Sequence, residues 1–333
     1  RAFASFGFCK AHAAAFALPT YQSAWLKTHY PAAFISGVLT HDPGMYPKRL
    51  MLDEARQMKV PLAPLDINYS GSDYRVEKVG ERHGIRIALS AVSGASEREI
   101  ATIEAGQPYL DLADFYRRSG ASAPTIETLI LTGALDGLHI SGEITHRDLL
   151  LHLADLQKTS APALSGAQMS LALAPPVLEA SGLPAMTPDE KMANELARLG
   201  MDISEHLLSP YADFLNAIGA TRSCDVVKQR SNSTVLVAGV KVALQSPPVR
   251  SGKRVLFLSL DDGYGCSDAT FFPDVLQARS GEYAQTLYAT SLFLVRGVTR
   301  RTGERGISIR ATGVWDLRSA YQEWNLKKGS VAI

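Results

Sequence analysis

The chain has 333 residues, of which 46% are hydrophobic and 20% charged, and its formal net charge at pH 7 is +1. This length suits several domains, and the near-zero charge excludes a global positive field, so any nucleic-acid binding must depend on local clusters of lysine and arginine. The three cysteines, Cys9, Cys224 and Cys266, form no CxxC pair. This spacing argues against a disulfide framework or a zinc site and favours a reducing, cytoplasmic compartment. No apolar stretch approaches the roughly 20 residues of a membrane helix, so no membrane partner is expected.

Residues 10–60 are predicted to be helical, because apolar residues recur there at helical spacing. Pro31 suits the first turn of a second helix, and a third helix is expected over Lys48–Met58. Pro19 should kink or divide the first helix, since proline lacks a backbone donor. The chain begins at Arg1 and not at methionine, so we expect it to be a piece of a longer protein.

Residues 60–65 contain two prolines and are expected to be extended, and residues 84–92 alternate well enough for a short strand. Three short helices joined by tight hairpins should follow, over residues 97–105, 109–118 and 125–132. Residues 158–188 are rich in Ala, Pro, Ser and Gly, which is typical of a linker at a domain boundary. Helix returns over residues 189–219, where Thr187 and Glu190 form a capping-box signal.

Beyond Thr234 the apolar period changes to two. Five short strands, with a longer insertion over residues 274–290 between the third and the fourth, are the layout of an OB-fold barrel. No internal repeat stands out. The predicted fold class is therefore a multidomain α+β chain with a helical segment at residues 1–62, a hairpin-rich helical region at 63–157, a linker at 158–188, a helical connector at 189–232, a five-stranded OB-fold barrel at 233–318 and a tail at 319–333.

The sequence contains no convincing active site. No Walker loop, GxGxxG, HExxH or GxSxG motif is present, and the eight histidines have no partners at ligand spacing. Asp261 and Asp262 resemble a magnesium-binding pair, but they precede Gly263 in a hairpin, where aspartate is common for turn reasons. We interpret this pair as turn chemistry, and we expect no metal site in the chain.

Two regions carry signals of nucleic-acid binding. In the turn around Gly94 and Ser96, with Arg98 on the following helix, backbone N–H groups could hold a phosphate, although a plain strand-to-helix connection has the same pattern. In the barrel, cations are interleaved with aromatic rings, as in single-strand grooves. The predicted groove residues are Lys253, Arg254, Phe271, Arg301 and Arg310.

Only one of the adjacent Phe271 and Phe272 can face the barrel core, because neighbouring strand residues point to opposite faces. The alternative to a groove is that the arginines are merely solvated. Lys10 and His12 stand at the start of the first predicted helix, two residues apart, so they do not share one helical face. Spacing does not decide whether they contact a ligand or only solvate the helix.

The segment FGFCKAHAAAFALPTYQSAWLKTHYPAAF, residues 6–34, resembles a characteristic fingers segment of the bacterial C-family DNA polymerases, the DnaE-like alpha subunits. PLAPLDIN, LILTGALDGL and KMANELARLGMDISEH follow in that family's order, ahead of the barrel. The resemblance covers almost the whole chain. It departs from the family pattern at Cys9 and Ala11 beside Lys10, at Pro19, and at Ser96, which replaces the second glycine of the first hairpin.

The resemblance implies a DNA-directed DNA polymerase whose Mg²⁺-binding palm lies before Arg1, so that this chain alone is inactive. The hairpins would grip duplex phosphates, the barrel would lie near the single-stranded template, and Lys10 and His12 would lie near the incoming deoxynucleotide or the primer-template. Implied partners are primer-template and single-stranded DNA, deoxynucleoside triphosphates, a sliding clamp and damage-induced accessory proteins.

Several stretches, among them HDPGMYPKRLMLDEARQ and FLVRGVTRRTGERGISIRATGVWDL, resemble the error-prone, translesion branch of the family, which acts in DNA repair. Two alternatives stay open. One is a non-enzymatic single-stranded-DNA-binding adaptor, and the other is a truncated replicative alpha subunit.

Overall fold

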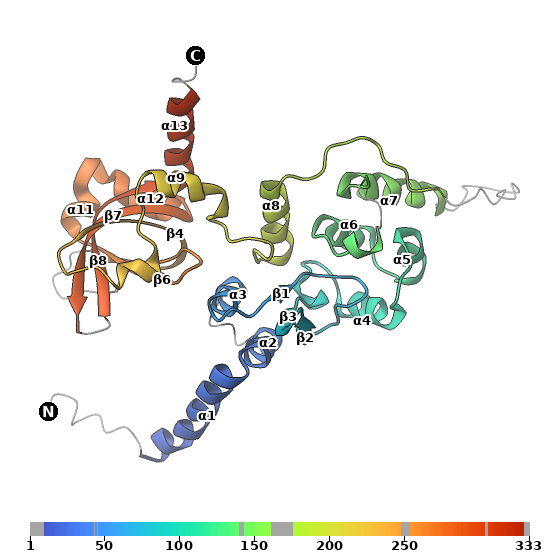
Figure 1. The fold of residues 1–333 in the computed structure, drawn as a ribbon, viewed down its shortest axis with the longest axis horizontal. Helices are drawn as coiled ribbons and strands as arrows, with labels where there is room; N and C mark the ends of the chain where they lie inside the picture. The colour runs from blue at the N-terminus through green and yellow to red at the C-terminus, as the bar shows by residue number, and fades with distance from the viewer. Residues whose placement is uncertain are drawn as a thin grey trace, which may run out of the picture. The chain divides into compact units, whose positions relative to one another are not determined.

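The computed structural model describes residues 10–42, 44, 46–139, 143–160, 176–247, 254–303 and 306–329. These residues form two compact units that divide after Ser204 (Figure 1). Each unit has a hydrophobic core of its own. The division falls later than the predicted linker at 158–188, because Leu199, Met201 and Ile203 pack into the core of the first unit.

The first unit begins with three helices, as expected: α1 (Lys10–His29), α2 (Pro31–His41) and α3 (Lys48–Gln57). Pro19 does not divide α1. The helix has 20 residues in total, and Pro19 lies in its interior. The ring removes one backbone donor, and the remaining intrahelical bonds hold the helix. Helix α2 begins at Pro31, where the missing N–H costs nothing, and buries Ile35 and Leu39.

A small three-stranded sheet follows, formed by β1 (Leu62–Ala63), β2 (Arg75–Val79) and β3 (Arg82–Arg86) in the order β1-β3-β2. The strand expected over residues 84–92 ends at Arg86, because the chain turns there into the short 3-10 helix η1 (Leu89–Ala91). Strand β2 was not predicted. Its sequence, RVEKV, has valine as its only apolar residue type and so gives little apolar signal. None of its residues is buried in the structure.

Within its described residues, the first unit contains five further α-helices: α4 (Glu97–Gly106), α5 (Leu112–Arg118), α6 (Ala123–Leu131), α7 (His146–Ser160) and α8 (Pro188–Leu199), with the 3-10 turn η2 (Asp136–Leu138) before α7. The helices expected at 97–105, 109–118 and 125–132 are confirmed as α4 to α6. Helix α7 was not predicted. The capping box at α8 is confirmed, since the Thr187 hydroxyl accepts from the Glu190 N–H and the Glu190 carboxylate accepts from the Thr187 N–H.

Replacing Thr187 with alanine should lower the stability of α8 by about 1 kcal/mol, because the N-cap acceptor is lost. Hydrogen exchange of the α8 amides measures the effect. The matched control is Thr102→Ala in the interior of α4, where the hydroxyl only bonds to the Arg98 carbonyl and alanine is the better helix former. Equal protection of α8 in the wild type and Thr187→Ala would contradict the capping role.

The second unit begins with three short helical segments, η3 (Ser209–Tyr211), α9 (Ala212–Ala217) and α10 (Ser223–Val226). All five predicted strands are present: β4 (Thr234–Gln245), β5 (Leu256–Asp261), β6 (Cys266–Phe271), β7 (Leu292–Thr302) and β8 (Gly306–Asp316). They close into a barrel in the order β4-β5-β6-β8-β7, with β6 and β8 parallel and the other pairs antiparallel. The predicted OB-like barrel is therefore confirmed.

The insertion between β6 and β7 contains α11 (Pro273–Gln277), the 3-10 turn η4 (Ala278–Gly281) and α12 (Glu282–Ala289), and α13 (Leu317–Gly329) follows the barrel. Gly297 lies where the pairing of β7 with β8 shifts register. A Cβ at this position would lie 2.6 Å from the Arg310 carbonyl oxygen, so only glycine allows β8 this close. This close approach positions Arg310 on the barrel.

Candidate nucleic-acid interface

A row of side chains crosses the outer face of the barrel from β5 to β8. Phe257 pairs with Thr270, and Thr270 pairs with Arg310. Paired residues of neighbouring strands stand on the same face. Phe257 is 43% exposed and Arg310 is exposed, so a flat ring and a cation are presented together. This face of the second and third barrel strands is the one that OB-folds use for oligonucleotides.

The structure corrects the choice between the two phenylalanines. Phe271 is fully buried in the barrel core, where its ring cannot stack on a base, so its prediction as a groove residue is wrong. Its neighbour Phe272 is half-buried, and the Arg310 guanidinium lies 5.3 Å from the centre of the Phe272 ring. Arg310 also lies 3.4 Å from the Asp274 carboxylate, on the surface. Phe257 and Phe272 are therefore the rings that accompany Arg310.

The other predicted groove cations differ in their surroundings. Arg254 is exposed and lies 5.4 Å from the ring of Tyr288, on α12. Lys253 lies outside the described residues. The Arg301 guanidinium donates to the backbone carbonyls of Val227 and Gln229. Arg301 thus holds the segment before β4 against the end of the barrel, and its contact with DNA stays a prediction.

The different surroundings of Arg301 and Arg310 give opposite expected effects of alanine. Arg301→Ala should lower the free energy of unfolding of the second unit by about 1 kcal/mol, because two carbonyls lose their donor. Arg310→Ala should leave stability within about 0.5 kcal/mol of the wild type and weaken single-stranded DNA binding about fivefold. Urea unfolding and fluorescence anisotropy measure the two effects. A loss of DNA binding without a loss of stability in Arg301→Ala, and the opposite in Arg310→Ala, would indicate that the DNA-binding face lies near Arg301.

Gly94, Ser96 and Arg98 lie together at the entrance to α4. Gly94 has a positive φ of 84°, and no atom lies within 4 Å of where its Cβ would be. Ser96 is the N-cap of α4, and both its N–H and its hydroxyl donate to the Glu99 carboxylate. The anion that accepts from these two donors of Ser96 is therefore a carboxylate of the protein itself. Arg98 is exposed on the first turn.

The same tetrapeptide, SGAS, occurs at residues 93–96 and 119–122, and in both places it leads into a helix. Gly120 has a positive φ of 64°, and Ser122 is the N-cap of α6. The Glu99 carboxylate accepts from the Ser122 N–H at 2.8 Å and from the Thr125 hydroxyl at 3.0 Å. One carboxylate thus joins two equivalent hairpins, which sequence reasoning missed. The repeated tetrapeptide was the available signal.

Hydrogen bonds from the backbone and the side chain of both Ser96 and Ser122 hold Glu99 ionised. They lower the pKa of its carboxyl from 4.5 to about 2, with the Ser96 backbone N–H the largest cause. Hydrogen bonds to a charged acceptor are stronger than neutral ones. The twin hairpins are therefore fixed relative to each other by a charge-assisted network.

Lys10 and His12 lie on the first turn of α1, and both are exposed. The His12 ring lies edge-on to the Phe16 ring at 4.6 Å between centroids. No residue of α1 is buried in this structure, although Phe16, Leu18 and Tyr21 are large apolar or aromatic side chains.

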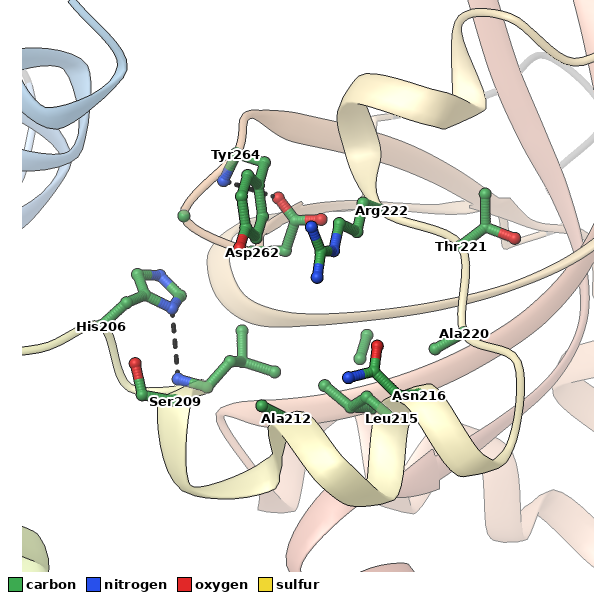
Figure 2. Close-up of a pocket in the computed structure, with 13 residues that line it drawn as sticks. His206, Ser209, Ala212, Leu215, Asn216, Ala220, Thr221, Arg222, Asp262 and Tyr264 are labelled. Atoms are coloured by element: carbon green, nitrogen blue, oxygen red, sulfur yellow. Dashed lines mark hydrogen bonds between the residues drawn. The ribbon is translucent and has the colours of Figure 1, made fainter. Parts of the chain in front are cut away.

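The Asp261–Asp262 pair forms the predicted turn. Asp261 accepts from the Gly263 N–H at 3.0 Å, and Asp262 accepts from the Tyr264 N–H at 3.0 Å (Figure 2). The Asp262 carboxylate also accepts from the N–H and the hydroxyl of Ser223, and Asp261 pairs with His206 at 3.2 Å. The two carboxylates therefore make the hydrogen bonds of a turn, as the sequence predicted.

Comparison with known proteins finds a helix-hairpin-helix match in the first unit and a set of similar DNA polymerases. The family described as "Helix-hairpin-helix motif" matches residues 59–143. An error-prone DNA polymerase of Symbiobacterium thermophilum is 33% identical over 94% of this chain and 32% of its own length. A DNA polymerase III alpha subunit of Pasteurella multocida is 33% identical over 89% of this chain and 26% of its own length. The error-prone DNA polymerase of Bdellovibrio bacteriovorus is 29% identical over 90% of this chain and 29% of its own length.

Over about nine-tenths of its length, the chain is similar to proteins named error-prone DNA polymerase or DNA polymerase III subunit alpha. It spans about a third of the length of the curated relatives that it matches. The match to these polymerases runs through both compact units, because it covers nine-tenths of the chain. The similarity to these polymerases therefore includes both the helix-hairpin-helix region and the barrel, in the order in which the sequence motifs predicted them. No helix within the described residues is long and apolar enough to cross a membrane.

Proposed function

We propose that this chain is the C-terminal, DNA-handling part of an error-prone DNA polymerase that adds deoxynucleotides during translesion synthesis and DNA repair in the cytoplasm. The observation that carries the proposal is the row of Phe257, Thr270 and Arg310 across an OB-like barrel, with Phe272 beside it. Cations bind the phosphates of a single strand and rings stack on its bases. The relatives named error-prone DNA polymerase support the choice of branch.

In this proposal the palm that binds Mg²⁺ and the deoxynucleoside triphosphates lies outside the chain. The hydrogen bonds of Asp261 and Asp262 within their own hairpin and with Ser223 agree with a turn role for this pair. Lys10 and His12 would serve that palm from the exposed first turn of α1. The twin hairpins would lie on the primer-template, and a sliding clamp and damage-induced accessory proteins would bring the enzyme to it.

A primer-extension experiment tests the assignment of the chemistry. With Mg²⁺, the four deoxynucleoside triphosphates and a primed template, the chain should bind the DNA and extend no primer. Extension by this chain would contradict a palm outside it. Failure to bind either primed or single-stranded DNA would contradict the DNA-handling role and would favour an adaptor that recruits other proteins.

The second candidate function is the replicative alpha subunit. The Pasteurella multocida relative with that name is as similar to this chain, at 33% identity, as the first error-prone relative. The two functions differ in damage tolerance. In cells, deletion of the whole gene should reduce survival and mutagenesis after DNA damage if the error-prone assignment is right, whereas a gene that growth itself requires would indicate the replicative subunit.

A further inference from the structure

A pocket of about 370 Å³ opens on the second unit between α9 and the hairpin that joins β5 to β6 (Figure 2). This volume lies within the range of small-molecule sites, about 300–1,000 Å³. The pocket is at the end of β5 that carries Asp261, whereas Phe257 of the outer row is four residues away along the strand. At the rise of a strand this is roughly 13 Å. The pocket is therefore separate from the outer row.

One wall of the pocket is an aromatic ring with a cation on it. The Arg222 guanidinium lies 4.6 Å from the centre of the Tyr264 ring, which is 52% exposed. The backbone under both residues is fixed by Asp262, which accepts from the Tyr264 N–H and from the N–H and hydroxyl of Ser223, next to Arg222. The backbone that carries Tyr264 and the backbone next to Arg222 are therefore fixed before any ligand arrives.

The opposite wall is apolar with a polar edge. Ala212 and Leu215 of α9 line it, with Ala238 of β4, and Figure 2 shows the Asn216 side chain beside them. The Asn216 amide offers both a donor and an acceptor at the rim. A slot between an aromatic wall and an aliphatic wall, with an amide at one edge, fits a flat ligand that carries hydrogen-bonding groups on its rim.

The charges in the pocket favour a neutral ligand. Arg222 and Asp262 both line the pocket, so its lining holds one guanidinium and one carboxylate and no excess of positive charge. His206 supplies no charge-binding donor toward the pocket, because its Nδ1 accepts from the Leu208 N–H and its Nε2 pairs with Asp261. A phosphate would meet no net positive field here. A nucleobase, which is flat and uncharged, needs none.

We propose that this pocket binds one unstacked nucleobase of a single-stranded DNA whose backbone crosses the outer row of the barrel. The inference rests on the proposed function, since it assumes that the barrel unit contacts a single strand. It adds a second contact, in which Tyr264 and Arg222 hold the face of the base and Asn216 contacts its edge.

The test compares two probes on the full chain, a short oligodeoxythymidine strand and the same strand with abasic sites in place of its bases. Tyr264→Ala should weaken binding of the base-bearing strand about tenfold and leave the abasic strand unchanged, because only a base can stack on the ring. The matched control is Tyr69→Ala, which removes another exposed tyrosine under an arginine, Arg86, in the other unit, and should change neither affinity.

A second variant, Ala212→Trp, fills the slot from an exposed position on α9 and should have the same selective effect, which covers the case in which Tyr264→Ala alters the hairpin. Equal losses of affinity for the two probes, or no loss for either, would overturn the proposal that the pocket binds a base. The binding role of the outer row would not be affected by that result. If the wild type binds neither probe, the proposed function fails and this inference fails with it.

Discussion

Replacing Phe271 with alanine should lower the free energy of unfolding of the barrel unit by about 3–5 kcal/mol, because a fully buried ring leaves a cavity when it is removed. The Phe271 side chain is 0% exposed and packs in one cluster with Leu256, Leu258 and Phe293. Urea unfolding, followed by the fluorescence of Trp315 on β8, measures the loss. A change below about 1 kcal/mol would contradict the inward orientation of Phe271.

Phe272→Ala is the matched control, since it removes the same ring one residue away. We expect it to cost less stability, because Phe272 is only half-buried. It should weaken single-stranded DNA binding about tenfold, as the loss of one stacked base contact does. If Phe271→Ala reduced affinity and Phe272→Ala reduced stability, the orientation of β6 would be the reverse of the one described.

Replacing Glu99 with glutamine should destabilise the helix-hairpin-helix region by about 2 kcal/mol. The carboxylate accepts hydrogen bonds from Ser96, Ser122 and Thr125, and an amide would turn an NH₂ group toward some of these donors. Urea unfolding of the first unit measures the loss. Glu97→Gln, in the same first turn of α4, is the control and should cost only a few tenths of a kcal/mol through the helix dipole.

The pH dependence of stability should identify Glu99 independently. Its folded pKa of about 2 lies below the ordinary value of 4.5. The ionised carboxylate therefore contributes its full stability above pH 4.5, and the contribution is lost as the pH falls from 4.5 toward 2. The wild type should lose stability across this window more steeply than Glu99→Gln. Parallel curves for the two proteins would contradict the assignment.

The barrel could be predicted from the sequence because its strands alternate and its turns contain glycine and acidic residues. The orientation of Phe271 was mistaken although the signal was present. Ala269 and Phe271 alternate with Asp268 and Thr270, and this phase places Phe271 inside. The burial of Phe271 was thus predictable from its own strand, whereas the pairing of Thr270 with Arg310 was not, because β6 and β8 are far apart in the sequence.

The helical region was harder to predict for a related reason. Glu99 was recognisable as an N-cap partner of Ser96, three residues away. Its bonds to Ser122 and Thr125 span 23 and 26 residues, and only the packing of α4 against the second hairpin creates them. The exposed strand β2 carries few apolar residues, so its pattern gave no signal. Local patterns predicted the elements, and contacts between distant segments determined the site.

The most direct test of the DNA-handling role is the affinity of the full chain for single-stranded DNA across a salt series. Each phosphate contact should contribute a slope of about −0.7 to log K against log salt concentration. Contacts from several barrel arginines should make the affinity fall steeply as salt rises, and Arg310→Ala should make the slope shallower by about 0.7. Absent binding, or an affinity that does not change with salt concentration, would contradict the DNA-handling role of this chain.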